Sequence, residues 1–166
     1  NEVRFCCEGC IEDFEADTAG GFRAIDAKMI ADQKPVYAMT TCLVSGDELG
    51  DGTIDFVYRN RLVRLCCKGC IEKFEADPTK YLAKLDEATI AQQRASYPFD
   101  TCIVMPDDTL DEHAPAKEIV VAGRLVRLCC ENCARKVQDN PHKYTAMIDA
   151  ARKAKGTRGT VGRQMG

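Results

Sequence analysis

Two short stretches of the chain alternate apolar and polar positions with the period of a β-strand. Every second residue from 54 to 58 is large and apolar, Arg59-Asn60 follows as a turn, and residues 61–65 return. The stretch 118–128 has the same layout around Ala122-Gly123, where a glycine suits the positive φ of a tight hairpin turn. The pattern therefore predicts two β-hairpins.

A helical spacing follows each predicted hairpin. Apolar residues fall three apart at Ile71 and Phe74, and again at Ala134 and Val137, which predicts a short helix. A longer helix should come next, opened by an N-cap and a proline at its first position. The caps are Asp77-Pro78 and Asn140-Pro141, and the expected buried faces are Tyr81, Leu82 and Leu85 in the first case, and Tyr144 and Ile148 in the second.

One cysteine-centred segment occurs three times, as VRFCCEGCIEDF, VRLCCKGCIEKF and VRLCCENCARKV. Its first cysteine stands at positions 6, 66 and 129, so the copies lie 60 and 63 residues apart. The last two copies are preceded by a second repeated element, YAMTTC at 37–42 and YPFDTC at 97–102. A fixed period of this kind is typical of an array of small structural units.

These repeats predict an α+β fold of tandem small fingers, each made of a knuckle, a β-hairpin, a short helix and a longer helix. So small a unit usually needs a metal ion or a disulfide for stability. We assign residues 1–34 to the C-terminal half of a truncated finger, 35–95 and 96–152 to two complete fingers, and 153–166 to a basic flexible tail.

The truncated finger should have an incomplete edge. Its segment Val3–Phe5 has no first hairpin strand to pair with in the sequence, and unpaired strand edges bind other chains readily. We expect either that the natural protein extends upstream of Asn1 or that a neighbouring chain pairs with this edge. A start other than Met also fits a processed N-terminus, such as one left by a cleaved signal peptide.

Charge and composition narrow the functional classes. The 166 residues include 23 basic and 26 acidic ones, and a net charge of −3 argues against general nucleic-acid binding. The last fifteen residues nevertheless carry +5 with no acid, so we expect a solvated tail or one that docks on an acidic partner. No stretch approaches the roughly twenty apolar residues of a membrane span. Eleven cysteines beside two histidines leave disulfides, thiolate metal sites or redox catalysis.

The cysteine spacing of the second unit favours a metal site. Cys66 should end the second strand and Cys70 should lie in the first turn of the following helix, where the positive helix end favours thiolates. The hairpin would carry Cys42 of the knuckle alongside them. Three thiolates from two separate segments are a plausible zinc or Cu(I) site.

The cysteine segments and the residues around them resemble a known group of treble-clef fingers, the TRASH and YHS domains, which are similar to MYM-type zinc fingers. The resemblance rests on residues 41–46, 61–70, Phe74 and 77–82, which give a knuckle cysteine, C-x3-C, phenylalanine and Asp-Pro-x-Lys-Tyr in this order. It covers residues 37–85 and 97–150 well, and 3–25 in part. The resemblance implies heavy-metal binding, in proteins suggested to sense or handle metals and often exported to the periplasm. The ligands it selects are Cys42, Cys66 and Cys70, then Cys102, Cys129 and Cys133, and in the truncated unit Cys6 and Cys10.

The sequence departs from the family pattern at two kinds of position. Ser45 and Met105 stand where a full treble clef has a second knuckle cysteine, and Cys67 is additional, as are its equivalents Cys7 and Cys130. Either Cys67 replaces the missing fourth ligand or the site is three-coordinate, which would suit Cu(I). The soft thioether of Met105 favours copper in the third unit. We therefore expect Zn or Cu(I), one ion per complete finger.

Three functions remain open. The first is non-enzymatic binding of soft or borderline metals for handling or sensing, in a periplasmic or otherwise exported protein. The second is a structural or adaptor subunit with purely structural zinc, in which the N-terminal edge strand and the basic tail dock on a larger assembly. Disulfides also remain open, because an exported protein meets an oxidising environment. The third is a thiol-disulfide oxidoreductase using C-x-x-C at a helix start. The chain lacks a βαβ thioredoxin pattern, so we expect no enzyme.

Overall fold

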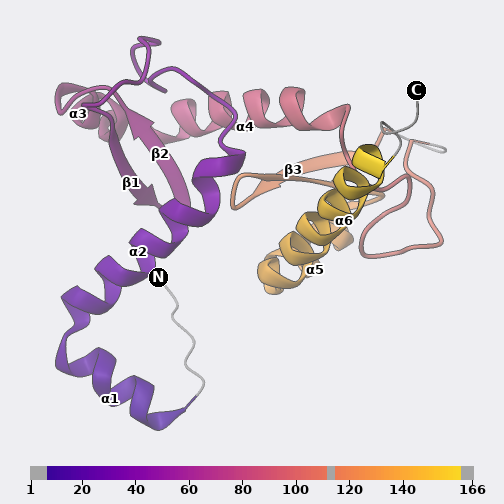
Figure 1. Ribbon diagram of the computed structural model, residues 1–166, viewed down its shortest axis with the longest axis horizontal. Coiled ribbons are helices and arrows are strands. Elements are labelled where there is room, and N and C mark those ends of the chain that lie inside the picture. Colours follow the sequence, from indigo (N-terminus) through magenta and orange to yellow (C-terminus); the bar gives the residue numbers. More distant parts are fainter. Residues whose placement is uncertain (1–6, 112–114, 162–166) are drawn as a thin grey trace. The chain divides into compact units, whose positions relative to one another are not determined.

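The fold places two cysteine-bearing hairpins among helices. The computed structural model describes residues 7–111 and 115–161, with side chains placed as far as residue 155. In this part of the chain the architecture is mixed α/β, with two separate antiparallel hairpins (Figure 1). The chain divides into two compact units, Asn1–Tyr81 and Leu82–Gly166. The division falls inside a helix, and not at the repeat boundary expected between residues 95 and 96.

The first unit begins with two helices, α1 (Glu8–Ala16) and α2 (Thr18–Gln33), followed by a short 3-10 turn, η1 (Lys34–Val36). Asp17 caps α2, since its Oδ1 accepts a hydrogen bond of 2.8 Å from the Gly20 amide. Helix α1 buries none of its residues. It lies at the end of α2 that is remote from the hairpin (Figure 1). The two helices contact each other through an edge-to-face pair, Phe14 and Phe22, with ring centres 5.2 Å apart.

The hairpin of the first unit is formed by β1 (Ile54–Tyr58) and β2 (Arg61–Leu65), with Phe56 opposite Val63. Arg59 and Asn60 have φ of 47° and 63°, the two positive values that a two-residue type I′ turn requires. The strands and the turn predicted from the sequence are therefore confirmed.

Helices α3 (Gly69–Ala76) and α4 (Pro78–Arg94) follow this hairpin. Phe74 of α3 is fully buried, with the rings of Phe56 and Tyr58 packed edge-to-face against it and Tyr81 stacked on it. The predicted cap is present, because Asp77 Oδ1 accepts a 3.2 Å hydrogen bond from the Lys80 amide.

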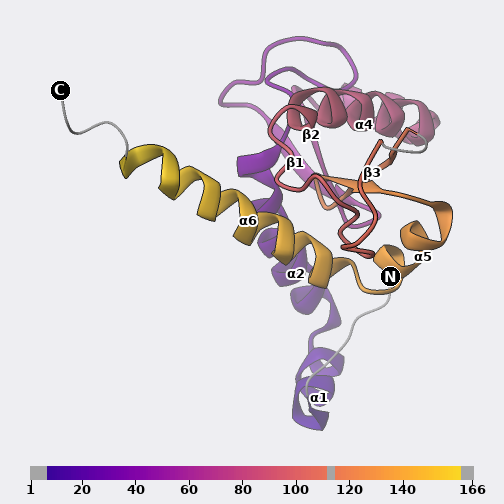
Figure 2. The ribbon, with the colours of Figure 1, turned by 90° about the vertical axis from the view of Figure 1, so that its right-hand side faces the viewer.

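The second unit repeats this arrangement with β3 (Lys117–Val121), β4 (Arg124–Leu128), α5 (Glu131–Asp139) and α6 (Pro141–Val161). Ala122 and Gly123 form the predicted turn, with φ of 46° and 75°. Both α5 and α6 pack on the hairpin (Figure 2). The core of the unit is built from the following buried residues: Tyr97, Cys102, Ile103, Leu110, Leu125, Val126, Leu128, Cys133, Ala134, Val137, Tyr144 and Ile148.

Helix α6 is longer than the sequence analysis expected. It continues to Val161, past the boundary placed after residue 152. The residues at that boundary, 151–155, are alanines, lysines and an arginine, all of which are strong helix formers. No helix in the described residues is long and apolar enough to cross a membrane.

A buried glutamine joins a helix to a hairpin in each unit. Gln33, at the end of α2, donates to the Asn60 carbonyl and accepts from the Leu62 amide, both at 2.9 Å. Gln93 of α4 does the same with the Gly123 carbonyl at 2.8 Å and the Leu125 amide at 2.9 Å. We call these contacts the glutamine clamps. They attach the long helix of one sequence repeat to the hairpin of the next.

Candidate metal centres

A tight loop before each hairpin positions the first cysteine of each candidate centre. Around Cys42, Thr41 forms an isolated antiparallel bridge with Glu48, and the Cys42 amide donates to the Asp47 carbonyl at 2.7 Å. Gly46 closes the loop with φ of 82°, a conformation that side chains disfavour. The loop therefore directs the Cys42 side chain inward, where it is fully buried.

The other two cysteines of the first centre come from the end of the hairpin. Cys66 directly follows β2, and Cys70 lies in the first turn of α3. The sulfurs of Cys42, Cys66 and Cys70 all lie within 4.8 Å of one another, and the Cys66–Cys70 distance is 3.7 Å. A tetrahedral zinc ion with Zn–S bonds of about 2.3 Å separates its sulfurs by about 3.8 Å. The three thiols therefore fit the sulfur spacing of such an ion.

The second centre reproduces this geometry in the other unit. Cys102, Cys129 and Cys133 have their sulfurs within 4.8 Å of one another, with 3.8 Å between those of Cys129 and Cys133. Cys102 and Cys133 are buried, while Cys129 is partly exposed, as Cys66 is in the first centre. Within the described residues, the chain thus holds two clusters of three cysteines that could bind a metal.

The two centres differ in the polar residues that lie next to the three sulfurs. Ser45 lies against the first centre, with its amide 3.5 Å from Cys42 Sγ and its hydroxyl 3.4 Å from Cys66 Sγ. In the second centre burial, together with the nearby Asp108 carboxylate, raises the pKa of the Cys129 thiol. The Met105 side chain is 42% exposed, and its backbone amide is the group that contacts Cys102.

Asp108 was not among the residues predicted for the site. The carbonyls of Asp47 and Asp108 accept hydrogen bonds from the amides of Cys42 and Cys102, respectively. Asp47 lies five residues after Cys42, whereas Asp108 lies six residues after Cys102, so the sequence spacing does not reveal that the two aspartates are equivalent.

The additional cysteines lie beside the three-sulfur groups and are not members of them. Cys67 and Cys130 are exposed, and their sulfurs lie 3.8 Å from Cys70 Sγ and 3.5 Å from Cys133 Sγ. In the first copy of the cysteine segment, Cys7 and Cys10 have their sulfurs 3.3 Å apart. Cys6 and the expected edge strand lie outside the described residues.

The cysteines of each centre differ in their pKa values and therefore in how readily they lose their protons. Burial opposes the charged form of Cys42, but hydrogen bonds from Ser45 and from backbone amides outweigh it and lower the pKa to about 6. Burial and the neighbouring thiols instead raise the pKa of Cys70 to about 12 and that of Cys133 to about 11. At neutral pH the first centre therefore holds thiolate and thiol together. A bound cation would take the place of the remaining protons.

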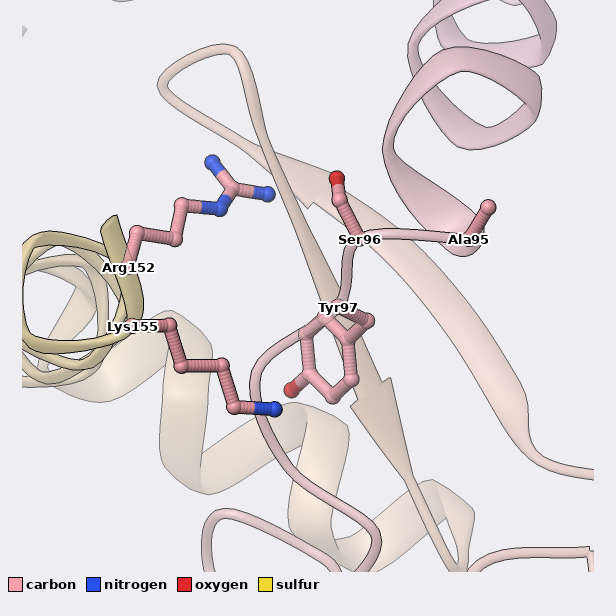
Figure 3. A pocket seen from close by; sticks show the side chains of 5 residues that line it. All are labelled: Ala95, Ser96, Tyr97, Arg152 and Lys155. Carbon is pink, nitrogen blue, oxygen red and sulfur yellow. The ribbon is translucent and has the colours of Figure 1, made fainter. Parts of the chain in front are cut away.

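The second unit also contains a pocket, with a volume of about 430 Å³, that has no cysteine in its lining. Arg152 and Lys155 of α6 face Tyr97 and Ser96 across it (Figure 3). Arg152 Nη2 donates to Gln93 Oε1 at 2.6 Å, and this contact ties α6 to the second glutamine clamp. The pocket is thus distinct from the cysteine centre.

Comparison of the chain with models of protein families, with curated proteins and with solved structures finds no match. The class of the protein is defined by its fold and its site: a mixed α/β chain with two three-cysteine clusters able to hold metal ions.

Proposed function

We propose that this chain binds one soft or borderline metal ion, Zn(II) or Cu(I), in each of its two cysteine clusters. The observation that carries this proposal is the convergence, twice, of three sulfurs from two separated segments. Disulfides are the competing arrangement, because Cys67 or Cys130 gives each group a fourth sulfur with which two disulfides could form. The knuckle, hairpin and helix around each group support an assignment to treble-clef fingers of the TRASH and YHS type.

Which metal each centre prefers depends on whether a fourth ligand is present beside the three thiolates. Zinc in proteins is almost always four-coordinate, whereas Cu(I) selects soft thiolates. In the second centre the Asp108 carboxylate near Cys129 is the candidate oxygen ligand for zinc, and it would have to move closer because it lies outside the three-sulfur group. In the first centre the nearest equivalent is the Ser45 hydroxyl, so three thiolates alone would favour Cu(I). The two centres are therefore expected to differ in their metal preference.

We further propose that the ion is handled by exchange and that the role is non-enzymatic. Cys66 and Cys129 are partly exposed, and each offers a sulfur to which a competing ligand has access. Coordination also accounts for near-identical copies of the cluster, which catalysis would not need. A purely structural role is the second candidate, since two of the three sulfurs in each centre are buried.

The binding proposal is tested by elemental analysis and native mass spectrometry of the full chain, purified without oxygen, together with a count of free thiols. We expect an ion in each three-cysteine centre. Cys42→Ser should remove the ion of the first centre and Cys102→Ser that of the second, so each variant serves as the control for the other. A metal-free protein with disulfides among these six cysteines would refute the proposal.

Exchange and structural roles are separated by kinetics. Transfer of the ion to a chelator should be faster than global unfolding if the ion is handled. A structural ion leaves only as the protein unfolds, so equal rates of release and unfolding would favour the second candidate.

A further inference from the structure

Each metal centre has an exposed cysteine beside one of its buried ligands. Cys67 lies three residues before Cys70 and Cys130 three residues before Cys133, with sulfur–sulfur distances of 3.8 Å and 3.5 Å. Cys70 is 4% exposed and Cys133 is 2% exposed, whereas Cys67 and Cys130 are open to solvent. Solvent can therefore reach one sulfur of each pair far more readily than the other.

The position of these pairs also permits a covalent bond between them. In each pair the two sulfurs lie within about two ångströms of disulfide bonding distance, across a C-x-x-C segment at the start of α3 or α5. The same spacing recurs in both units, although the residues between the cysteines differ, Lys68-Gly69 against Glu131-Asn132.

We propose that Cys67 and Cys130 are oxidation sites through which a peroxide ejects the metal from each centre. This proposal rests on the proposed metal binding, because it concerns the fate of an ion held by Cys70 or Cys133. It assigns to the additional cysteines a role other than coordination.

The reaction takes two steps, with hydrogen peroxide as the oxidant. The exposed sulfur of Cys67 attacks the peroxide, an S–O bond forms, the O–O bond breaks, and hydroxide leaves as water after protonation. The sulfur of Cys70 then attacks Cys67, an S–S bond forms, the S–O bond breaks, and a second water leaves. The Cys67 thiol and the metal-bound Cys70 thiolate together lose two electrons to one hydrogen peroxide, and the two waters formed take one proton from Cys67 and one from solvent. The same steps apply to Cys130 and Cys133.

The disulfide removes one ligand from the centre. Cys70 leaves the ligand set once its sulfur is bonded to Cys67, and two thiolates remain in the first centre. Since metal affinity depends on the number of thiolate ligands, the ion is released without a change in its own charge. Reduction of the disulfide by a thiol restores the centre.

The test uses the full chain loaded with Zn(II) and treated anaerobically with hydrogen peroxide, while a chromogenic chelator reports zinc release. We compare the unmodified protein with Cys67→Ser, Cys130→Ser and the double variant. In the double variant, release from both three-cysteine centres should be at least about tenfold slower, because only partly shielded ligand sulfurs remain to react. Each single variant should slow release from its own centre only, so the unaltered centre is the internal control.

Peptide mapping identifies the product. We expect disulfides joining Cys67 to Cys70 and Cys130 to Cys133, with Cys66 and Cys129 still free to be alkylated. A Cys66–Cys70 disulfide, or equal release rates in all variants, overturns the proposal. A double variant that binds no zinc before treatment also overturns it, since Cys67 and Cys130 would then be ligands. An unmodified protein that binds no zinc instead refutes the proposed function itself.

Discussion

Single residues next to the cysteines determine the charge and the hydrogen bonds of the site at which each centre would bind a cation. In the first centre the Ser45 amide and hydroxyl contact two different sulfurs, so a residue standing at an expected ligand position instead stabilises a thiolate through hydrogen bonds. In the second centre Asp108 contributes a negative charge beside Cys129. Centres with the same three cysteines therefore differ in charge and in hydrogen bonding.

The pKa values of the first centre predict how its metal affinity depends on pH. Cys42 is ionised at neutral pH, since its pKa is about 6, whereas Cys70, with a pKa of about 12, retains its proton. Cys66 also retains its proton: the hydrogen bond with Ser45 favours the thiolate, but burial and neighbouring thiols raise its pKa. Zinc binding should thus release about two protons per ion at pH 7.5 and about three well below pH 6, so affinity falls more steeply in acid.

Calorimetric titration of Cys102→Ser protein, in buffers that differ in ionisation enthalpy, counts these protons for the first centre alone. Ser45→Ala serves as the comparison: the Ser45 hydroxyl, although it contacts Cys66, also lowers the pKa of Cys42, so its loss should raise that pKa and move the change from two protons to three toward neutral pH. Release of three protons at pH 7.5 in the unaltered centre would contradict the assigned ionisation of Cys42.

At the scale of elements, the glutamine clamps hold each hairpin against a helix. Gln93 is 5% exposed and satisfies the Gly123 carbonyl and the Leu125 amide together. A buried peptide group without a partner destabilises a fold by about 1–3 kcal/mol. Since β4 ends at Leu128, directly before Cys129, the clamp also fixes the strand that leads to the second centre.

Gln93→Ala should therefore lower the free energy of unfolding by about 2–4 kcal/mol, because it leaves two hairpin groups unpaired. The matched control is Gln92→Ala, which alters the adjacent, exposed glutamine and should change the free energy by less than about 0.5 kcal/mol. Urea unfolding of the full chain at fixed metal loading measures both. Equal losses in the two variants would show that the clamp contributes nothing specific.

At the scale of the whole molecule, sequence repeats and compact units are out of phase. The repeat boundary expected at residue 95 separates Gln93 from its hairpin, whereas the division at Tyr81 and Leu82 keeps them together. Ile90 also packs against the core of the second unit. The end of α4 thus lies in the second sequence repeat, but its side chains contact the hairpin and the core of the third.

A fragment of residues 78–166 should fold cooperatively and bind metal at its three-cysteine centre, because it retains Ile90 and Gln93. A fragment of residues 96–166 retains every cysteine of the centre but loses both contacts, so we expect it to bind zinc at least about tenfold more weakly. Circular dichroism and competitive zinc titration compare the two fragments. Equal affinity and equal helix content would show that α4 is not needed by the second centre.

The sequence allowed prediction of those features that depend on residues close to one another in the chain or on regular spacing. The turns at Arg59-Asn60 and Ala122-Gly123, the caps at Asp77 and Asn140, and the grouping of cysteines all follow from neighbouring residues and from spacing. The glutamine clamps were missed because their partners lie 27 to 32 residues further along the chain. Only the 60-residue separation of Gln33 and Gln93, equal to the first repeat period, could have indicated them.

The clamps also determine where such a chain can be duplicated or spliced. A segment that starts at the capping residue Asp17 and ends before Asp77 contains a long helix, the hairpin it holds and one complete centre. The segment from Asp77 to the residue before Asn140 contains the same set. A gene duplication or an engineered insertion with these end points adds one such set, whereas cuts at the start of the cysteine segments would separate Cys42 from Cys66 and Cys70, and Cys102 from Cys129 and Cys133. The capping residues are thus the positions at which one further set of long helix, hairpin and three-cysteine centre could be inserted.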